Sequence, residues 1–393
     1  MKTETKQRIE QIRHGNVPEG YKKTKAGILP ADWDLHMLGD CLSRVEKPVE
    51  VKPNELYTQI GIRSHGKGLF YKEPVTGAAL GNKAVFWIEP DCFIVNIVFA
   101  WEQAIGKTTQ SEVGMIGSHR FPMYRPVNDR VDIDYLISYF LTKRGTDILE
   151  AASPGGAGRN KTLGQDRFLK SKIILPPIEE QRKIAAILTT QDKVIELKER
   201  RLAEKQRQKK YLMQQLLTGK KRLPGFSGEW SFLKAKEIFQ NVSDKDHNGD
   251  LPVLSSTQDK GIVPRDEVDI DIKYDTCSLV NYKKVSKGNF VISLRSFQGG
   301  IEYSTYTGLV SPAYTVLSSR KEISDGYYKQ FFKSTDYINR LNVAVYGIRD
   351  GKQISYEDFG RLRIPYPPIK EQDAIAEVLS TADHEIDLLQ QDI

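Results

Sequence analysis

The glycine-rich segment 155–162, GGAGRNKT, is close to the pattern of a phosphate-binding loop. That pattern needs glycine immediately before the lysine, because the backbone there must approach the phosphates, and here Asn160 precedes Lys161. The motif also needs a strand before the loop and a helix after it, whereas residues 133–152 have the apolar spacing of a helix. We therefore expect no nucleotide site in this segment.

Other patterns that could support catalysis are also incomplete. The segments Leu175–Ile178 and Tyr366–Ile369 resemble the NPPY motif of amino-methyltransferases, but both lack its polar first residue and its aromatic last residue. The match of 271–273 to half of a nuclease motif is too short to carry weight. The six histidines and three cysteines are scattered, without metal-ligand or disulfide spacing. The sequence thus predicts no catalytic residues, no metal and no cofactor of its own, and a reducing cytoplasmic setting.

Donors suited to nucleic acid do occur, in glycine-containing loops that follow strands or precede helices. Arg and Lys can reach guanine O6 and N7, and Asn and Gln can pair with adenine. The alternative is that these are ordinary surface-loop residues, and half or more of protein–DNA contacts go to the backbone in any case. The candidate DNA-binding residues are Arg63, Lys67, His119, Arg120, Arg159, Asn160, Lys161, Lys260, Arg295, Gln298, Arg349, Lys352 and Gln353.

A long helix is the element that must position these loops. Residues 175–217 contain no glycine and are rich in Lys, Glu, Gln, Leu and Ala, with proline only at the entry, where a helix tolerates it. At about 1.5 Å per residue such a helix is roughly 60 Å long. Its apolar stripe is narrow and follows a heptad spacing, which indicates a coiled-coil seam that needs a partner helix.

The partner is a second copy of the same segment. PPIEEQ at 176–181 matches PPIKEQ at 367–372, and the apolar positions behind the two motifs then correspond. We expect an antiparallel pair in which Leu188, Ile195 and Leu202 face Leu379, Ile386 and Ile393. The complete predicted seam comprises Ile184, Leu188, Ile195, Leu202, Ile375, Leu379, Ile386 and Ile393.

The duplication extends to the globular parts, so the chain reads as two copies of one α+β unit with an internal pseudo-two-fold repeat. Each copy shows strands first, including 93–99 and 277–282, and then one late helix, at 133–152 and 327–341. Closing strands are expected at 168–175 and 361–365. The expected divisions are an N-terminal helix and linker (1–26), a first globular domain (27–174), a central helical region (175–222), a second globular domain (223–366) and a distal helix (367–393).

These features together resemble the specificity subunits of type I restriction–modification systems. The twin PPI[EK]EQ segments, the YLMQQLLTGKKRLPGF exit and the two intervening domains carry the resemblance. It implies two target-recognition domains that read the halves of a bipartite site in double-stranded DNA, and helices that set the spacing and dock two methyltransferase subunits. It also allows for restriction subunits with motor and nuclease activity. S-adenosylmethionine, ATP and Mg²⁺ would belong to those partners. A coiled-coil scaffold and a single-chain DNA-modifying enzyme are the alternatives.

The net charge of +7 is concentrated in the central helical region, where residues 176–222 hold thirteen Lys or Arg against six Asp or Glu. Such a surface either faces phosphate or is simply solvated. Lys220, Lys221 and Arg222 are the expected phosphate contacts. No apolar run approaches the 18 or so residues of a membrane span. A short helix at 3–14 is expected to pack beside the end of the distal helix and complete that arm; the alternative is a disordered tail, which is common at chain termini.

Overall fold

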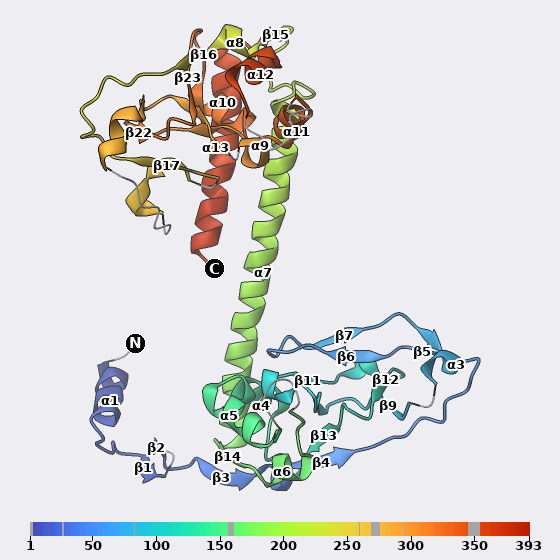
Figure 1. Ribbon diagram of the computed structural model, residues 1–393. Coiled ribbons are helices and arrows are strands. Elements are labelled where there is room, and N and C mark those ends of the chain that lie inside the picture. The colour runs from blue at the N-terminus through green and yellow to red at the C-terminus, as the bar shows by residue number, and fades with distance from the viewer. Residues whose placement is uncertain are drawn as a thin grey trace. The chain divides into compact units, whose positions relative to one another are not determined.

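The structure is a computed structural model that describes residues 3–25, 27–81, 83–155, 161–258, 260–268, 276–294, 296–344 and 354–393. It divides into two compact units, Met1–Val194 and Ile195–Ile393 (Figure 1). Helix α7 (Ile178–Leu216) is continuous and contributes residues to both units.

The first unit is built around an antiparallel sheet of order β11-β10-β13-β4. Helices α4 and α5 follow the last of these strands, and β14 then pairs with β3 before the chain enters α7. Its elements are α1 (Thr3–Arg13), β1 (Tyr21–Thr24), β2 (Gly27–Pro30), β3 (Asp34–Met37), α2 (Leu38–Cys41), β4 (Leu42–Val45), β5 (Leu56–Tyr57), β6 (Ile60–Ile62), β7 (Leu69–Tyr71), β8 (Val75–Thr76), α3 (Gly77–Leu80), β9 (Val85–Trp87), β10 (Phe93–Val95), η1 (Ala100–Glu102), β11 (Ile105–Lys107), η2 (Gln110–Glu112), β12 (Ile116–Ser118), β13 (Met123–Pro126), α4 (Ile133–Phe140), α5 (Lys143–Ala151), α6 (Gln165–Lys170) and β14 (Lys172–Leu175).

The second unit repeats this topology. Its main sheet has the order β21-β20-β23-β16, and β24 pairs with β15 as β14 pairs with β3. Its elements are β15 (Ser231–Lys234), α8 (Ala235–Ile238), β16 (Phe239–Val242), β17 (Leu254–Thr257), β18 (Gly261–Pro264), η3 (Arg265–Glu267), η4 (Thr276–Asn281), β19 (Lys283–Val285), β20 (Phe290–Ile292), α9 (Ser296–Gly299), β21 (Glu302–Tyr303), β22 (Gly308–Val310), β23 (Thr315–Ser319), α10 (Asp325–Phe331), α11 (Thr335–Ala344), α12 (Tyr356–Arg361), β24 (Arg363–Tyr366) and α13 (Ile369–Gln391).

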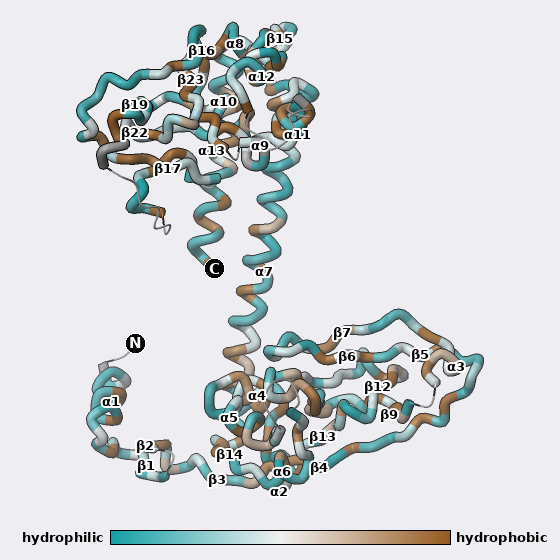
Figure 2. The backbone as a smooth tube through the Cα atoms, viewed as in Figure 1, coloured by the Kyte–Doolittle hydropathy of each residue, from teal (hydrophilic) through white to brown (hydrophobic). Residues whose placement is uncertain are grey.

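Each unit has an aromatic core between its main sheet and its late helices. In the first, Phe93, Phe140 and Phe168 are fully buried and contact one another at ring-centroid distances of 5.5–6.1 Å. In the second, Phe239 and Phe332 lie at the centre, 5.4 Å apart. In Figure 2, α7 is mostly hydrophilic with isolated apolar residues. The α+β class and the duplication expected from the sequence are confirmed.

Several element boundaries differ from the expectation. The helix expected at 133–152 is two helices, because Thr142 caps a new one by accepting a hydrogen bond from the Gly145 N–H at 3.2 Å. The second unit has the same break between α10 and α11. The strand expected at 277–282 is the 3₁₀ helix η4, and the first part of the closing segment 168–175 belongs to α6.

Within the second unit, α13 runs antiparallel to α7, and lysines of α7 pair with acidic residues of α13. Lys198 pairs with Asp392 at 3.0 Å, Lys205 with Glu385 at 2.8 Å, and Lys209 with Asp383. Residue numbers rise along one helix as they fall along the other, which fixes the direction. The ion pairs lie between apolar residues, so the contact is a mixed seam whose register is set partly by charge.

The register differs from the one we expected. Leu379 packs in the core of the second unit with Leu216 and the half-buried Leu212, and that core includes none of Leu188, Ile195 and Leu202. Ile386 is buried, but Glu385 beside it lies against Lys205, and Ile195 remains 42% exposed. The physical reason is that the sequence repeat matches residues that hold the same place in their own unit. Such residues need not contact each other where the two helices pack together. Of the other predicted seam residues, Ile375 is buried, Ile184 packs against the first unit's core, Leu202 is half-buried, and Leu188 and Ile393 are exposed.

Candidate DNA interface

Segment 96–103, which follows β10, gathers most of the candidate loops of the first unit. The β6–β7 turn is attached to it: the backbone N–H of His65 donates to Glu102 O at 2.8 Å, and the N–H of Gly66 donates to Gln103 O at 2.9 Å. This turn has left-handed φ angles at His65 and Gly66, 59° and 64°. Arg63 and Lys67 are thereby held, exposed, beside η1.

The other candidates of this unit that the structure describes lie at the same segment. The Ile97 N–H donates to Arg120 O at 3.0 Å, which places the exposed pair His119 and Arg120 next to it. Lys161 Nζ lies 5.2 Å from the centroid of the Trp101 ring, a cation–π arrangement. The sequence identified the loops but not the segment they share, because its residues read only as an apolar strand.

A groove runs along this segment, with a volume of about 450 Å³. A neighbouring hollow of about 350 Å³ shares Lys72, Asn96, Phe99 and Phe121 with it. The lining of the larger groove combines cations, amide side chains and aromatic rings, which is the composition expected of a nucleic-acid surface. The residues lining the larger groove are Gln59, Ile60, Lys72, Lys83, Val85, Asn96, Val98, Phe99, Ser118, His119, Arg120 and Phe121.

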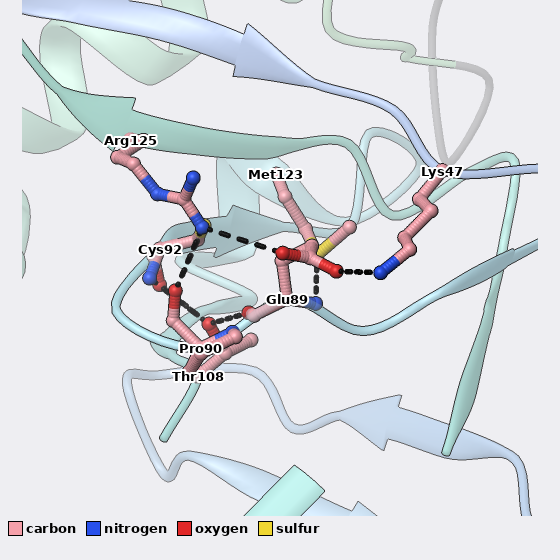
Figure 3. Close-up of polar contacts among 7 residues, drawn as sticks. All are labelled: Lys47, Glu89, Pro90, Cys92, Thr108, Met123 and Arg125. Atoms are coloured by element: carbon pink, nitrogen blue, oxygen red, sulfur yellow. Dashed lines mark hydrogen bonds and ion pairs between the residues drawn. The ribbon is translucent and has the colours of Figure 1, made fainter. Parts of the chain in front are cut away.

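Not every cation of this unit is available for DNA. Figure 3 shows Lys47 and Arg125 both directed at Glu89, at 2.8 and 3.6 Å. The hydrogen bond from Lys47 and the charge of Arg125 lower the pKa of Glu89 below its ordinary value, so this carboxylate stays ionised. Cys92 beside them is buried, and burial raises the pKa of its thiol. Lys72, Lys83 and Arg120, in contrast, have no ion-pair partner within the described part of the chain.

In the second unit, the exposed Lys260 occupies the β17–β18 turn, the counterpart of the β6–β7 turn. It lines a pocket of about 510 Å³ together with Lys209, Lys329 and Lys333. Lys209 is paired with Asp383 and Lys333 with Glu302, so Lys260 and Lys329 are the cations of this pocket without an ion-pair partner among the described residues. Gln298 is exposed on α9 and does not line the pocket.

Five further candidates lie in parts of the chain that the structure does not describe: Arg159 and Asn160 in the first unit, and Arg349, Lys352 and Gln353 in the second. Arg295 lies outside the described residues as well.

The twin PPI[EK]EQ motifs anchor each long helix to its own unit. Trp33 donates its indole N–H to Glu180 at 3.1 Å, and Trp230 does the same to Glu371 at 2.9 Å. The glutamines after them are buried and bind the start of the late helix. Gln181 accepts a hydrogen bond from the Asp132 N–H, and Gln372 accepts one from the Ser324 N–H, both at 3.0 Å. Asp132 is the N-cap residue of α4, and Ser324 is the N-cap residue of α10.

Arg222, which we expected to contact phosphate, is engaged in the second anchor. Its Nε and Nη2 donate to the two oxygens of Glu371 at 2.5 and 2.6 Å. The hydrogen bond to Glu371 raises the pKa of Arg222, and the carboxylate is fully buried. This prediction from charge runs was wrong because a run of cations does not reveal an acid 149 positions away in sequence. Lys220 and Lys221 are exposed.

Within the described residues, no group of three or more His, Cys, Asp or Glu could hold a metal ion. Over the same part of the chain, no helix combines the length and apolar character needed to cross a bilayer.

Comparisons with known proteins all indicate the same protein family. The chain is 24% identical over 402 residues to the putative type I restriction enzyme MjaX specificity subunit of Methanocaldococcus jannaschii, covering 94% of this chain and 91% of that protein. The HsdS subunit of Thermoanaerobacter tengcongensis has a similar fold, with TM-score 0.52, 20% identity and 92% of each chain covered. The S subunit of M. genitalium matches with TM-score 0.53 and 13% identity, over 92% of this chain and 91% of that one.

A third solved structure, from work on assembly and conformational transition of the type I R-M system, matches with TM-score 0.54 and 19% identity. It covers 92% of this chain and 93% of that one. The family model of the type I restriction modification DNA specificity domain matches residues 89–206 and 228–393, one stretch for each copy of the repeat. Because this match spans most of the chain, the protein belongs to that family and is a type I restriction–modification specificity subunit, the non-catalytic component that recognises DNA.

Proposed function

We propose that each unit reads one half of a bipartite DNA site and that α7 sets the distance between the two halves. The observation that carries the proposal is the repeated topology, in which the equivalent turns β6–β7 and β17–β18 each present an exposed lysine, Lys67 and Lys260. Two similar readers on one chain suit a site in two parts, with half-sites about one helical turn or 34 Å apart.

In the first unit, the groove beside segment 96–103 is the proposed DNA surface. Lys72, Lys83 and Arg120 supply exposed positive charge for phosphates, and the amides of Gln59 and Asn96 supply base contacts. In the second unit we propose Lys260 and Lys329 as phosphate contacts. The further DNA contacts that we propose lie outside the described residues and are Arg159, Asn160, Arg295, Arg349, Lys352 and Gln353.

The partners proposed are two methyltransferase subunits, which carry S-adenosylmethionine and methylate adenine. Restriction subunits with ATP and Mg²⁺ are the further components. The support in this chain is a set of exposed apolar residues on α7, which soluble surfaces rarely gather on one helix without a binding partner. Their exposed fractions are 62% for Ile187, 41% for Leu188, 38% for Val194, 42% for Ile195 and 59% for Leu197.

A domain exchange tests the two-reader proposal. Residues 27–174 are replaced by the corresponding domain of another family member, and the methylated sites are sequenced in cells that carry the complete system. We expect one half of the site to change and the other half and the spacing to persist. A change in both halves, or in neither, contradicts the proposal. An exchange of residues 223–366 is the matched control and should alter the opposite half.

A further inference from the structure

We propose that Asn96 is a base-reading residue of the first unit and that its side-chain NH₂ group selects a base edge rich in hydrogen-bond acceptors, such as that of guanine or thymine. The inference rests on the proposed function, because it names the residue through which one half-site is read. It was not among the sequence candidates.

The position of Asn96 is fixed by the backbone around it. It follows β10 directly and is 8% exposed. Its own N–H donates to Ala104 O at 2.9 Å, and the Val98 N–H donates to its side-chain Oδ1 at 3.1 Å. A backbone N–H can only donate, so the amide oxygen must be the atom that faces Val98, and the NH₂ group is left over.

That NH₂ group has no hydrogen-bond partner within the described part of the chain, yet it is not sealed from solvent. Asn96 lines both the 450 Å³ groove and the adjoining 350 Å³ hollow. A buried polar group without a partner costs free energy, so such groups in folded proteins usually meet water or a ligand. An amide at the floor of a cationic groove is therefore placed to bind something that enters it.

The rim of the groove indicates what enters. Lys72, Lys83 and Arg120 are exposed and unpaired among the described residues, and they suit the phosphates that flank a bound base pair. Phe99 is 36% exposed beside them and offers an apolar surface to a base or to a thymine methyl group.

The chemistry of the amide sets the preference. Asn reads adenine when its oxygen and its NH₂ both face the base, but here the oxygen is already bound to Val98. The NH₂ group offers two donors, which match guanine O6 and N7 or thymine O4. Cytosine presents an N4–H₂ donor in the major groove and would be rejected. The equivalent position in the second unit holds the buried Ser293, so the two units differ at this point.

The test uses the full chain and a randomised double-stranded DNA library, from which bound sequences are selected and read. Asn96→Asp keeps the shape and the acceptor for Val98 but replaces both donors with an acceptor. We expect one position in one half-site to shift from guanine or thymine towards cytosine or adenine, with a loss of affinity for the wild-type site on the order of ten- to a hundredfold. Asn54→Asp, the same change at an exposed turn, is the control and should leave the selected site unchanged.

The selected sequences distinguish a failure of the proposed role of Asn96 from a failure of the proposed function. If the wild-type chain selects a bipartite site and Asn96→Asp selects the same one, only the inference fails. If the wild-type chain selects no site, the proposed function fails and takes the inference with it. Should the Asp variant melt early, Arg120→Ala examines the same groove from its exposed rim. The Arg120→Ala variant should bind all DNA sequences more weakly and reduce the slope of affinity against salt concentration by about one. An unchanged slope would contradict the proposal that this groove binds DNA.

Discussion

Replacing Glu371 with glutamine tests how strongly the second unit holds its helix. The carboxylate is fully buried and accepts from Arg222 at 2.5 and 2.6 Å and from Trp230 at 2.9 Å. Glutamine keeps the shape but removes the charge and turns an NH₂ group towards these donors. Removing one partner of a buried ion pair costs about 3–5 kcal/mol. Because the Arg222 side chain is 24% exposed and can be rehydrated, we expect the lower end, about 3 kcal/mol.

The duplication supplies a matched control. Glu180 occupies the same place in the first unit and accepts from Trp33 at 3.1 Å, but no arginine is among its hydrogen-bond or ion-pair partners in the described residues. Glu180→Gln therefore weakens one indole hydrogen bond, at a cost of about 1 kcal/mol. The difference between the two variants measures the contribution of Arg222.

Hydrogen exchange on the full chain is the suitable assay, because a chain with two units need not unfold in one step. Exchange resolves each unit separately through the amides of α4 in the first and of α10 and the start of α13 in the second. Glu371→Gln should speed exchange in the second unit only. Equal effects of the two substitutions, or an effect of Glu371→Gln on the first unit alone, would refute the reasoning.

Three further predictions concern the helices and the DNA surface. Ile386→Asp should lower the free energy of unfolding measured by exchange in α13 by about 2–4 kcal/mol, because the Ile386 side chain is only 9% exposed. Ile195→Asp should lower it by under about 0.5 kcal/mol, because Ile195 is 42% exposed. Equal costs of the two substitutions would support the register expected from the sequence. Lys205 lowers the pKa of Glu385 through their hydrogen bond, so the stability from this pair is present above the ordinary pKa of that carboxyl and is lost as pH falls through the lowered value. Exchange of the last turns of α13 should quicken in acid and in high salt, and the Lys205→Glu, Glu385→Lys double variant should behave as wild type where Lys205→Glu does not. Lys161→Ala should weaken filter-binding affinity equally for all DNA sequences and lower the salt slope by about one; relaxed discrimination at a single base position would instead make Lys161 a base contact.

Much of the architecture could be read from the sequence because it depends on local signals. The long helix follows from a run of helix formers without glycine and with proline only at the entry. The repeat follows from matching PPI[EK]EQ segments and the strands that correspond upstream. The boundaries that were wrong, at Thr142 and in η4, depend on a single capping hydrogen bond or on a 3₁₀ turn, which apolar spacing does not register.

The loops with DNA-binding donors were visible in the sequence, but their common hub was not. Segment 96–103 reads as apolar residues, and only the folded chain brings the turns at 63–68 and 119–120 to it through backbone hydrogen bonds. The proposed role of Asn96 also depends on the folded chain, because the Val98 N–H donates to its side-chain oxygen and so orients the amide.

Sequence alone therefore determined the class, the duplication and the family resemblance, since these rest on composition, periodicity and motif spacing. The tertiary structure decided which charges are free and which residues of the two helices meet. Arg222 lies in a basic run but is bound by Glu371, and Lys47 and Arg125 are bound by Glu89, while Arg120 has no ion-pair partner among the described residues. The physical reason is that neutralisation and register depend on distances between residues far apart in the chain, and those distances exist only once both units have folded.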